Sequence, residues 1–252
     1  MSGPSGRRSA ALVGYAGCSE GFPTVADLVS VIIPAYNAAR YLGAAIDSVI
    51  AQTHDRVEIV VVDDASTDGT ASVAAHYGTA VRYAEQTHRG QAAARNLGAG
   101  ISTGRYLAFL DADDLWEPEK LAIQLAAFDA HPGLDVVFGR VVQFWSPEVA
   151  VQYGPSFPHE SEPLRGDHPG TMLVPRAVFD EIGPFREDNV IGDFIDWYAR
   201  ALDDGRSMLM LEPVVMRRRL HGTNLGRMTN SGPEEYARVL RQVIDRRRGC
   251  AG

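Results

Sequence analysis

The sequence predicts an α/β protein: a single domain with a mixed, mainly parallel sheet flanked by helices. Three observations support this prediction. Apolar runs are long enough for buried strands, segments with helical spacing separate them, and polar residues follow several of the runs directly. Apolar strands that alternate with helices are typical of parallel pairing with helices on both faces, because such strands are buried on both sides.

The first half of the chain repeats a strand–helix unit. Strands are predicted at 28–37, 57–66, 80–86 and 105–113, and helices at 38–52, 67–78 and 91–102. For the second helix, Ser66 and Asp68 are N-cap candidates, because short polar side chains accept hydrogen bonds from free amide groups. Gly78 is its expected end.

The second half is less regular. It predicts an amphipathic helix at 117–133 with acidic residues in its first turn, a strand at 134–145, a helix at 192–204, a strand at 207–221 and a closing helix at 233–248. Residues 146–170 are rich in proline and predict a long surface loop. Loops of this length within a domain usually carry function or move.

Composition and charge exclude several classes of protein. The net charge of −8 argues against nucleic-acid binding, which favours a basic surplus. Cys18 and Cys250 lie near the two ends, which favours a reducing compartment over a disulfide framework. No run reaches the roughly 18 apolar residues of a transmembrane helix. The apolar piece after Arg7 and Arg8 is short and broken by glycine, unlike an export signal. We therefore expect a cytoplasmic protein.

Polar clusters follow three of the predicted strands. They are Pro34 to Asn37, Asp63 with Asp64, and Asp111 to Asp114. The carboxyl ends of parallel strands share one edge of a sheet, where open α/β sheets bind ligands. Each cluster alone is ordinary turn chemistry, whereas three on one edge predict a binding site.

The acidic clusters suit a hard divalent cation, which prefers oxygen ligands and would relieve the repulsion between carboxylates. Such a cation could also bind a diphosphate. Arg89 and Arg95 could contact phosphate or a base, and Gly90 permits close approach of the backbone. The helix that starts near Gln91 would direct its amide groups the same way. The alternative for Arg95 is an ordinary surface position on that helix.

Three segments, in their order and spacing, resemble glycosyltransferase family 2, the inverting nucleotide-sugar transferases of the Rossmann-like GT-A fold. They are VSVIIPAYNAARYLGAAIDSVIAQT, VEIVVVDDASTDGT and RGQAAARNLGAGISTGRYLAFLDADD. The resemblance is close over residues 29–130 and looser to about 225. It implies a nucleotide-sugar-binding half at 29–130 and an acceptor and catalytic half at 131–225. A flexible N-terminal arm at 1–28 and a C-terminal helix at 226–252 would flank them.

The resemblance also implies roles for individual residues. Ala35 and Tyr36 would pack on a uracil base that Asp64 hydrogen-bonds. Asp111-Ala112-Asp113 matches the family's Asp-x-Asp, in which the last acid binds Mn²⁺ or Mg²⁺ on the diphosphate and the first faces the sugar or ribose. The implied nucleotide-binding set is Pro34, Ala35, Tyr36, Asp64, Arg89, Gly90, Arg95, Asp111 and Ala112. The implied metal set is Asp113, Asp111 and His221.

An inverting transfer needs a general base that takes the proton from the acceptor. The family places an acidic pair at the start of a helix in the second half. Here GDFIDWYAR (192–200) matches imperfectly, because Gly192 stands where an acid is expected. Asp193 is therefore the candidate base, and Asp196 at i+3 is the alternate on roughly the same face. The competing interpretation of Asp193 is a helix N-cap.

The segment RRRLHGTN (217–224) has a basic run followed by a histidine. In similar enzymes such a segment closes over the diphosphate, so His221 is a candidate metal ligand or phosphate contact. A purely structural histidine is the alternative.

The predicted function is a metal-dependent inverting glycosyltransferase with a UDP-sugar as the expected donor. The acceptor, whether carbohydrate, peptide, lipid or small natural product, matches no motif in the chain. One alternative is a haloacid-dehalogenase-type phosphohydrolase, which also has an Asp-x-Asp after a strand. Those enzymes place it on the first strand, with a small β-branched residue where Leu115 stands here. The other alternative is a non-catalytic sugar-nucleotide-binding or carbohydrate-binding module, which Gly192 leaves open.

Overall fold

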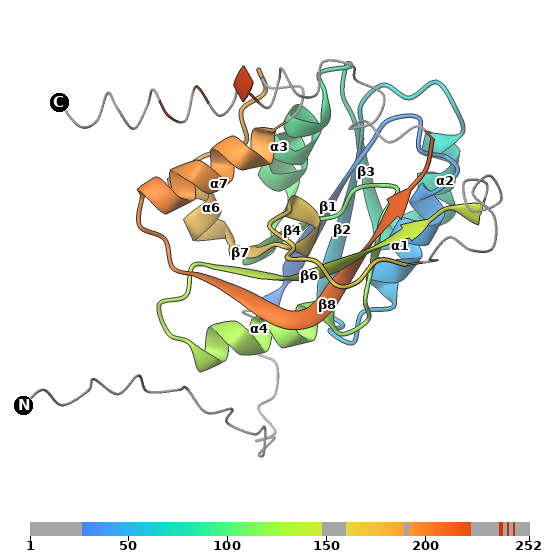
Figure 1. Ribbon diagram of the computed structural model, residues 1–252. Coiled ribbons are helices and arrows are strands. Elements are labelled where there is room, and N and C mark those ends of the chain that lie inside the picture. Colours follow the sequence, from blue (N-terminus) through green and yellow to red (C-terminus); the bar gives the residue numbers. More distant parts are fainter. Residues whose placement is uncertain are drawn as a thin grey trace, which may run out of the picture.

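The aliphatic runs of the first half form parallel strands, as their sequence predicts. The computed structural model describes residues 27–147, 160–188, 192–222 and, near the C-terminus, 237, 238, 241 and 244. Within these ranges eight strands make one sheet, in the order β3-β2-β1-β4-β7-β6-β8-β5 (Figure 1). The predicted N-terminal arm lies outside the described residues except for 27 and 28. The predicted C-terminal helix lies outside them except for the four isolated positions, which are helical.

The strands are β1 Val29–Ala35, β2 Val57–Asp63, β3 Val81–Glu85, β4 Tyr106–Phe109, β5 Leu115–Trp116, β6 Val136–Trp145, β7 Leu173–Pro175 and β8 Met208–Leu220. The α-helices are α1 Leu42–Ile50, α2 Thr70–His76, α3 Gln91–Ile101, α4 Lys120–Ala130, α6 Arg176–Ile182 and α7 Asp193–Asp203. Two short 3₁₀ helices are η2 Gly78–Ala80 and η3 Pro169–Thr171.

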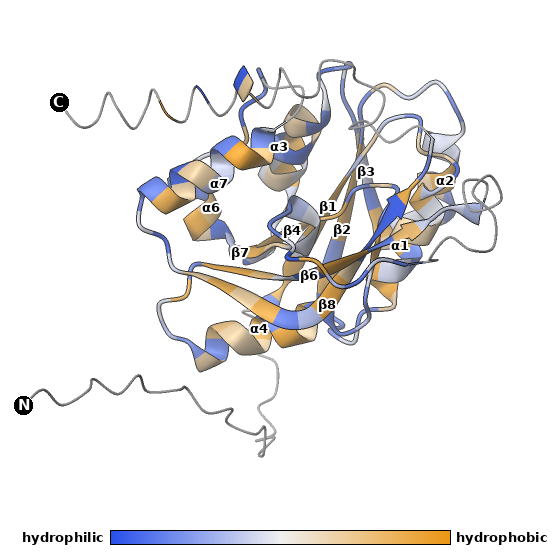
Figure 2. Cartoon of the chain, viewed as in Figure 1, coloured by the Kyte–Doolittle hydropathy of each residue, from blue (hydrophilic) through white to orange (hydrophobic). Residues whose placement is uncertain are grey.

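Helices cover both faces of the parallel strands, with α1 and α2 on one side and α3, α6 and α7 on the other (Figure 1). Every residue of β1 is buried, and successive side chains point to opposite faces. Ile33 shares a core cluster with Leu42 of α1. Its neighbour Ile32 shares another with Ala92 of α3 and Trp197 of α7. Apolar colour accordingly concentrates in the central strands, while the helices show both colours (Figure 2).

The second half adds strands of both directions. β7 pairs antiparallel with β4 and with β6, β6 pairs parallel with β8, and β5 pairs antiparallel with β8. The sequence did not predict β5, β7 or α6. Strands of two and three residues are too short to show a period, so only their pairing defines them.

The start of one predicted helix was wrong in detail. The helix predicted at 117–133 begins only at Lys120, because the amide of Glu117 donates to the carbonyl of Val215 on β8 (3.0 Å). The acidic residues therefore precede the helix. The described end of the predicted surface loop, 160–170, lies along β6, where Leu164 exchanges backbone hydrogen bonds with Val141. This segment buries Gly166 and Gly170.

In the described part of the chain, the helices are too short or too polar to span a lipid bilayer.

We predict that Gly98→Ala destabilises the protein by about 1–3 kcal/mol. Gly98 lies where α3 crosses β1, and a Cβ there would come within 2.4 Å of Ile32 Cγ2 in the core. Chemical denaturation would measure the change. The matched control is Gly100→Ala on the same helix, where a Cβ meets nothing within 4 Å. This control should gain about 0.5–1 kcal/mol through helix propensity. Equal effects at the two positions would contradict the close packing of α3 on β1.

Candidate active site

The three predicted polar clusters meet at one edge of the sheet. In the parallel register Ala35 at the end of β1 lies beside Asp63 at the end of β2, and Ile32 lies beside Phe109 at the end of β4. The amide of Asp64 donates to the carbonyl of Ala35 (2.8 Å). The strand ends therefore hold all three clusters together, as the sequence predicts.

Asp64 is buried and organises the segment 86–90. Its Oδ1 accepts hydrogen bonds from Gln86 Nε2 (2.7 Å) and the Arg89 amide (2.7 Å). Its Oδ2 accepts one from the Gly90 amide (2.9 Å) and lies 2.9 Å from His88 Nδ1. Both carboxylate oxygens are thus occupied by one loop. Sequence reasoning missed Gln86 and His88, because neither stands in a recognisable pattern.

The predicted base-binding residues lie beside this loop. Pro34 and Ala35 are buried in β1, and the Tyr36 ring is 50% exposed at its end. The rings of Tyr36 and His88 lie 4.4 Å apart, tilted by 33°. Gly90 has φ of +90° where α3 begins, a conformation that strains any other residue. The Arg89 side chain pairs with Glu187.

Arg95 is the central residue of the site. It is only 2% exposed, so the surface interpretation of this position was wrong. Its Nη2 donates to Asp111 Oδ1 (2.7 Å) and its Nη1 to Asp193 Oδ2 (2.6 Å). Asp111 Oδ1 also accepts from Gln91 Nε2 (2.8 Å). One guanidinium therefore joins the end of β4 to the start of α7.

Burial disfavours the charged forms of Arg95 and Asp111, but the attraction between opposite charges outweighs this effect. Burial alone would lower the pKa of Arg95, but the carboxylates of Asp193 and Asp111 hold it above its usual value. Burial would likewise raise the pKa of Asp111, but Arg95 holds it below its usual range. Both groups are charged at neutral pH.

The two candidate bases occupy different surroundings. Asp193 is the first residue of α7, and the structure assigns the N-cap position to Gly192, with no side-chain cap. The N-cap interpretation of Asp193 was therefore wrong. Gly192 has φ of +88°, which explains why this position lacks the expected acid. Asp196 is fully buried and accepts from Arg200 Nε (2.9 Å), with Arg186 Nε 3.5 Å away. Its carboxylate belongs to an internal arginine cluster.

The end of β8 lies against the second half of the Asp-x-Asp segment. Asp113 Oδ2 and His221 Nε2 are 2.8 Å apart, so the structure brings these two predicted ligands together. Arg219 donates from its Nε to the carbonyl of Asp113 (2.9 Å) and from its amide to Asp114 Oδ1 (2.8 Å). Asp114 therefore holds β8 against the end of the Asp-x-Asp segment. Burial, followed by the charges of Asp113 and Asp111, raises the pKa of Asp114 well above its usual value.

The arginine run 217–219 divides between the two faces of β8. The guanidinium groups of Arg217 and Arg219 lie over the Phe144 ring, 5.2 and 4.6 Å from its centre. Arg217 also pairs with Glu160. Alternation turns Arg218 to the other face. There its positive charge adds to that of Arg95 in lowering the pKa of Asp111, and it opposes the rise in the pKa of Asp114.

His168 faces the same edge, although the sequence marks it only as part of a proline-rich loop. Its Nδ1 accepts a hydrogen bond from the Gly170 amide (3.0 Å), and its Nε2 lies 3.9 Å from Asp111 Oδ2. Burial and the charges of Arg218 and Arg95 lower the pKa of His168 to about 4, despite the opposing effect of Asp111. The imidazole is therefore neutral at physiological pH.

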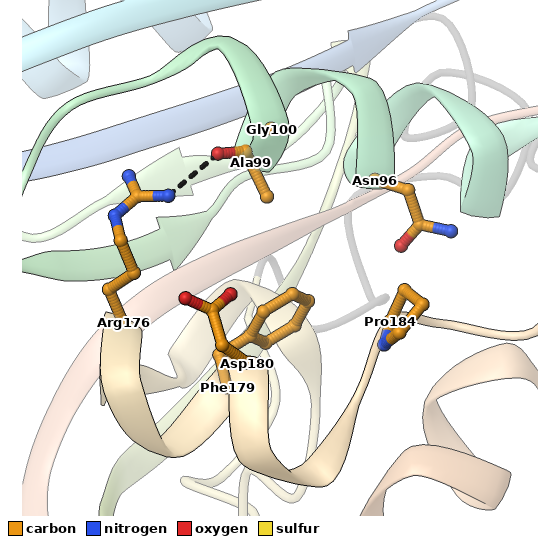
Figure 3. Close-up of a pocket in the computed structure, with 7 residues that line it drawn as sticks. All are labelled: Asn96, Ala99, Gly100, Arg176, Phe179, Asp180 and Pro184. Atoms are coloured by element: carbon orange, nitrogen blue, oxygen red, sulfur yellow. Dashed lines mark hydrogen bonds between the residues drawn. The ribbon is translucent and has the colours of Figure 1, made fainter.

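A surface pocket of about 380 Å³ lies away from this edge, between α3 and α6 (Figure 3). The Arg176 guanidinium at its rim donates to the carbonyl of Ala99 (2.7 Å) and to Ser102 Oγ (2.8 Å), at the end of α3. Asn96 pairs with the backbone of Phe185. These polar groups join the two helices and do not converge on a ligand.

Comparison with known proteins places this fold and site in a family. The sequence pattern described as "Glycosyl transferase family 2" matches residues 30–183, more than half of the chain. The chain therefore belongs to glycosyl transferase family 2, and the family predicted from the sequence is confirmed. This assignment replaces the phosphohydrolase interpretation.

Individual relatives agree with the family. An uncharacterised glycosyltransferase of Rickettsia typhi is 30% identical over 224 residues, which cover 84% of this chain and 70% of the relative. A second, from Rickettsia felis, is 34% identical over 173 residues, or 64% of this chain and 29% of the relative. This chain thus spans less than a third of the length of the Rickettsia felis protein.

The fold resembles that of S. aureus TarS. The structure of TarS 1-349 in complex with UDP-GlcNAc superposes with a TM-score of 0.70 at 21% identity, covering 86% of this chain and 65% of that one. The predicted mixed, mainly parallel GT-A architecture is confirmed.

We predict that Arg95→Met lowers stability by about 3–5 kcal/mol at neutral pH, because two carboxylates lose their buried partner. Denaturation across a pH series would measure this loss. The pKa of Asp111 is lowered in the folded protein, so the pair's contribution is present above the unfolded pKa and fades as the pH falls through the folded value. The difference between variant and wild type should narrow in acid.

Arg105→Met is the control for this prediction. Its side chain is 59% exposed and lies 3.7 Å from Asp27, so we expect a change below about 0.5 kcal/mol. An Arg95→Met protein as stable as wild type would contradict the central place given to this ion pair.

Proposed function

We propose that the chain is a metal-dependent, inverting glycosyltransferase that uses a UDP-sugar donor. The observation that carries the proposal is the bridge through Arg95, which holds the first acid of the Asp-x-Asp segment and the candidate base on one guanidinium. An inverting displacement needs a base on the face of the reacting carbon opposite the leaving group, and Asp193 lies close enough to the donor-binding Asp111 to serve as one. TarS, which shares the fold, was solved with UDP-GlcNAc, and this makes UDP-GlcNAc the first donor to test.

In this proposal the nucleotide lies across the ends of β1 and β2. A uracil would stack on Tyr36 and donate a hydrogen bond to Asp64. The Asp64 carboxylate already contacts Gln86, His88 and the amides of Arg89 and Gly90, so one of these four contacts must break when the base binds. His88 is the best candidate, since its side chain is 60% exposed and its ring already lies against Tyr36. The ring of His88 would then leave the place that the base takes.

A divalent cation fits the second half of the Asp-x-Asp segment. Asp113 Oδ2 and His221 Nε2 are adjacent at 2.8 Å, a separation that suits neighbouring ligands on one ion. Among the described residues, no group of three or more Asp, Glu, His or Cys side chains could hold an ion by itself. Diphosphate oxygens and water would therefore complete the shell. When bound, Mn²⁺ or Mg²⁺ would stabilise the negative charge of the departing nucleoside diphosphate.

The protein's own residues supply the remaining functions. Arg218 places a positive charge on the face of β8 that is turned towards Asp111, where it can attract the diphosphate. Asp193 takes the proton of the attacking acceptor group, and Arg95 orients its carboxylate. Both carboxylates are paired with arginine, but that of Asp193 is 12% exposed and shares Arg95 with Asp111, whereas that of Asp196 is fully buried between Arg186 and Arg200. An acceptor could therefore reach Asp193 and not Asp196.

We predict that the protein binds UDP-GlcNAc in the presence of Mn²⁺, and that Asp113→Ala abolishes the metal-dependent part of this binding. Calorimetry with UDP and a panel of nucleotide sugars, with and without Mn²⁺, measures both effects. Asp180→Ala, an exposed change on α6, is the control and should bind like wild type. UDP binding without turnover of any donor would favour a binding module. Identical binding with and without Mn²⁺ would contradict the metal site.

We predict that Asp193→Asn lowers transfer, or slow hydrolysis of the donor, by about a hundredfold or more while UDP affinity stays unchanged. Steady-state kinetics alongside calorimetry separates the two quantities. Asp196→Asn is the comparison. It should lower the melting temperature, because it weakens a buried ion pair, yet keep the activity of the folded fraction. Full activity of Asp193→Asn would refute its assignment as the base.

A further inference from the structure

His168 lies half-buried at the edge of the sheet, and neither the sequence pattern nor the proposed function gives it a role. Its side chain is 27% exposed and reaches the edge of the sheet from the end of the 160–170 segment. The charged groups around it come from four other elements. Asp111 follows β4, Arg95 lies on α3, Arg218 lies on β8 and Asp193 begins α7. The ring therefore lies among the residues to which the proposed function gives roles in donor binding and in catalysis.

A backbone contact defines the hydrogen-bonding character of this ring. The amide of Gly170 donates to Nδ1 at 3.0 Å, so Nδ1 carries a lone pair and no proton. In a neutral imidazole the proton then lies on Nε2, which becomes a hydrogen-bond donor. The nitrogen that faces Asp111 is therefore a hydrogen-bond donor.

Buried side chains hold the backbone around His168 in place. Trp116 Nε1 donates to the carbonyl of Gly170 (2.8 Å), and Gln124 Nε2 donates to that of Thr171 (2.7 Å). The amide of Thr171 donates to the carbonyl of His168 itself (3.1 Å), and its hydroxyl lies within hydrogen-bonding distance of the carbonyls of Gly166 and His168. Gly170 has no room for a side chain, since a Cβ would come within 2.4 Å of Met216 Sδ. This arrangement fixes the direction in which the imidazole points.

An acceptor faces the Nε2–H group across a gap. Asp111 Oδ1 is occupied by Arg95 and Gln91, while Oδ2 lies 3.9 Å from His168 Nε2. That separation is too long for a direct hydrogen bond. It suits a single hydroxyl group, which can accept from the N–H and donate to the carboxylate at the same time. A donor and an acceptor separated in this way are complementary to a sugar hydroxyl.

We propose that His168 Nε2–H and Asp111 Oδ2 together bind one hydroxyl of the transferred sugar, which makes His168 a determinant of donor-sugar specificity. The proposal rests on the proposed function, because it requires a nucleotide-sugar donor at this edge. It adds a residue from outside the Asp-x-Asp segment and a reason for the buried polar contacts that hold η3. No covalent step is assigned to His168.

Two amide variants test the proposal, because each can replace one of the two ring nitrogens. In His168→Asn the amide oxygen can replace Nδ1 and keep the hydrogen bond from Gly170, but nothing replaces the Nε2–H donor. In His168→Gln the amide nitrogen reaches approximately the position of Nε2. Calorimetry should compare the affinities for UDP, UDP-GlcNAc, UDP-GalNAc and UDP-glucose. A melting curve for each variant checks that it folds.

We expect His168→Asn to bind UDP as tightly as wild type. Its affinity for the preferred UDP-sugar should fall by about fivefold to tenfold, the loss expected for one neutral hydrogen bond. It should also discriminate less among the three sugars. His168→Gln should recover most of the loss. Equal weakening of UDP and UDP-sugar binding would make His168 a structural residue, and unchanged sugar-dependent affinity would overturn the proposal.

The same measurements separate this proposal from the proposed function. If wild-type protein binds none of the nucleotide sugars, the proposed function fails and the role of His168 fails with it. If wild type binds a UDP-sugar more tightly than UDP and His168→Asn does the same to the same degree, only the proposal for His168 fails.

Discussion

The site depends on one buried guanidinium. Arg95 on α3 holds two carboxylates that are 82 positions apart in the chain: Asp111 after β4 and Asp193 at the start of α7. A buried charge of this kind is tolerated only when its partners are placed well. The packing of α3 on β1 and the position of α7 must therefore agree, because both helices contribute to the same ion pair. The fold and the candidate chemistry are linked through this residue.

Charge pairing also organises the rest of this edge of the sheet. Asp111, Asp113 and Asp114 repel one another, and burial together with this repulsion raises the pKa of Asp114. Positive groups come from elements distant in sequence, with Arg95 from α3 and Arg219 from β8. A divalent cation beside Asp113 and His221 is the proposed further partner of these carboxylates.

Sequence patterns predicted the first half of the fold well, because long aliphatic strands and amphipathic helices have clear periods. They failed for β5 and β7, which exist only through pairing. At the site, the Asp-x-Asp segment and Asp193 were recognisable from their motifs, although their roles remain predictions. His168 and His88 were not recognisable, since a histidine in a loop has no pattern, and only its neighbours distinguish it from any other surface residue.

The sequence by itself determined the family, the parallel core and the carboxylates that gather at its edge. These features depend on local composition and on the order of segments, which can be read along the chain. Only the tertiary structure decided how the charges pair. It turned Arg95 from a helix-surface position into a buried bridge, placed Asp196 in a separate arginine cluster and brought His168 to Asp111. Long-range pairing depends on how elements pack in three dimensions, and no local pattern records that packing.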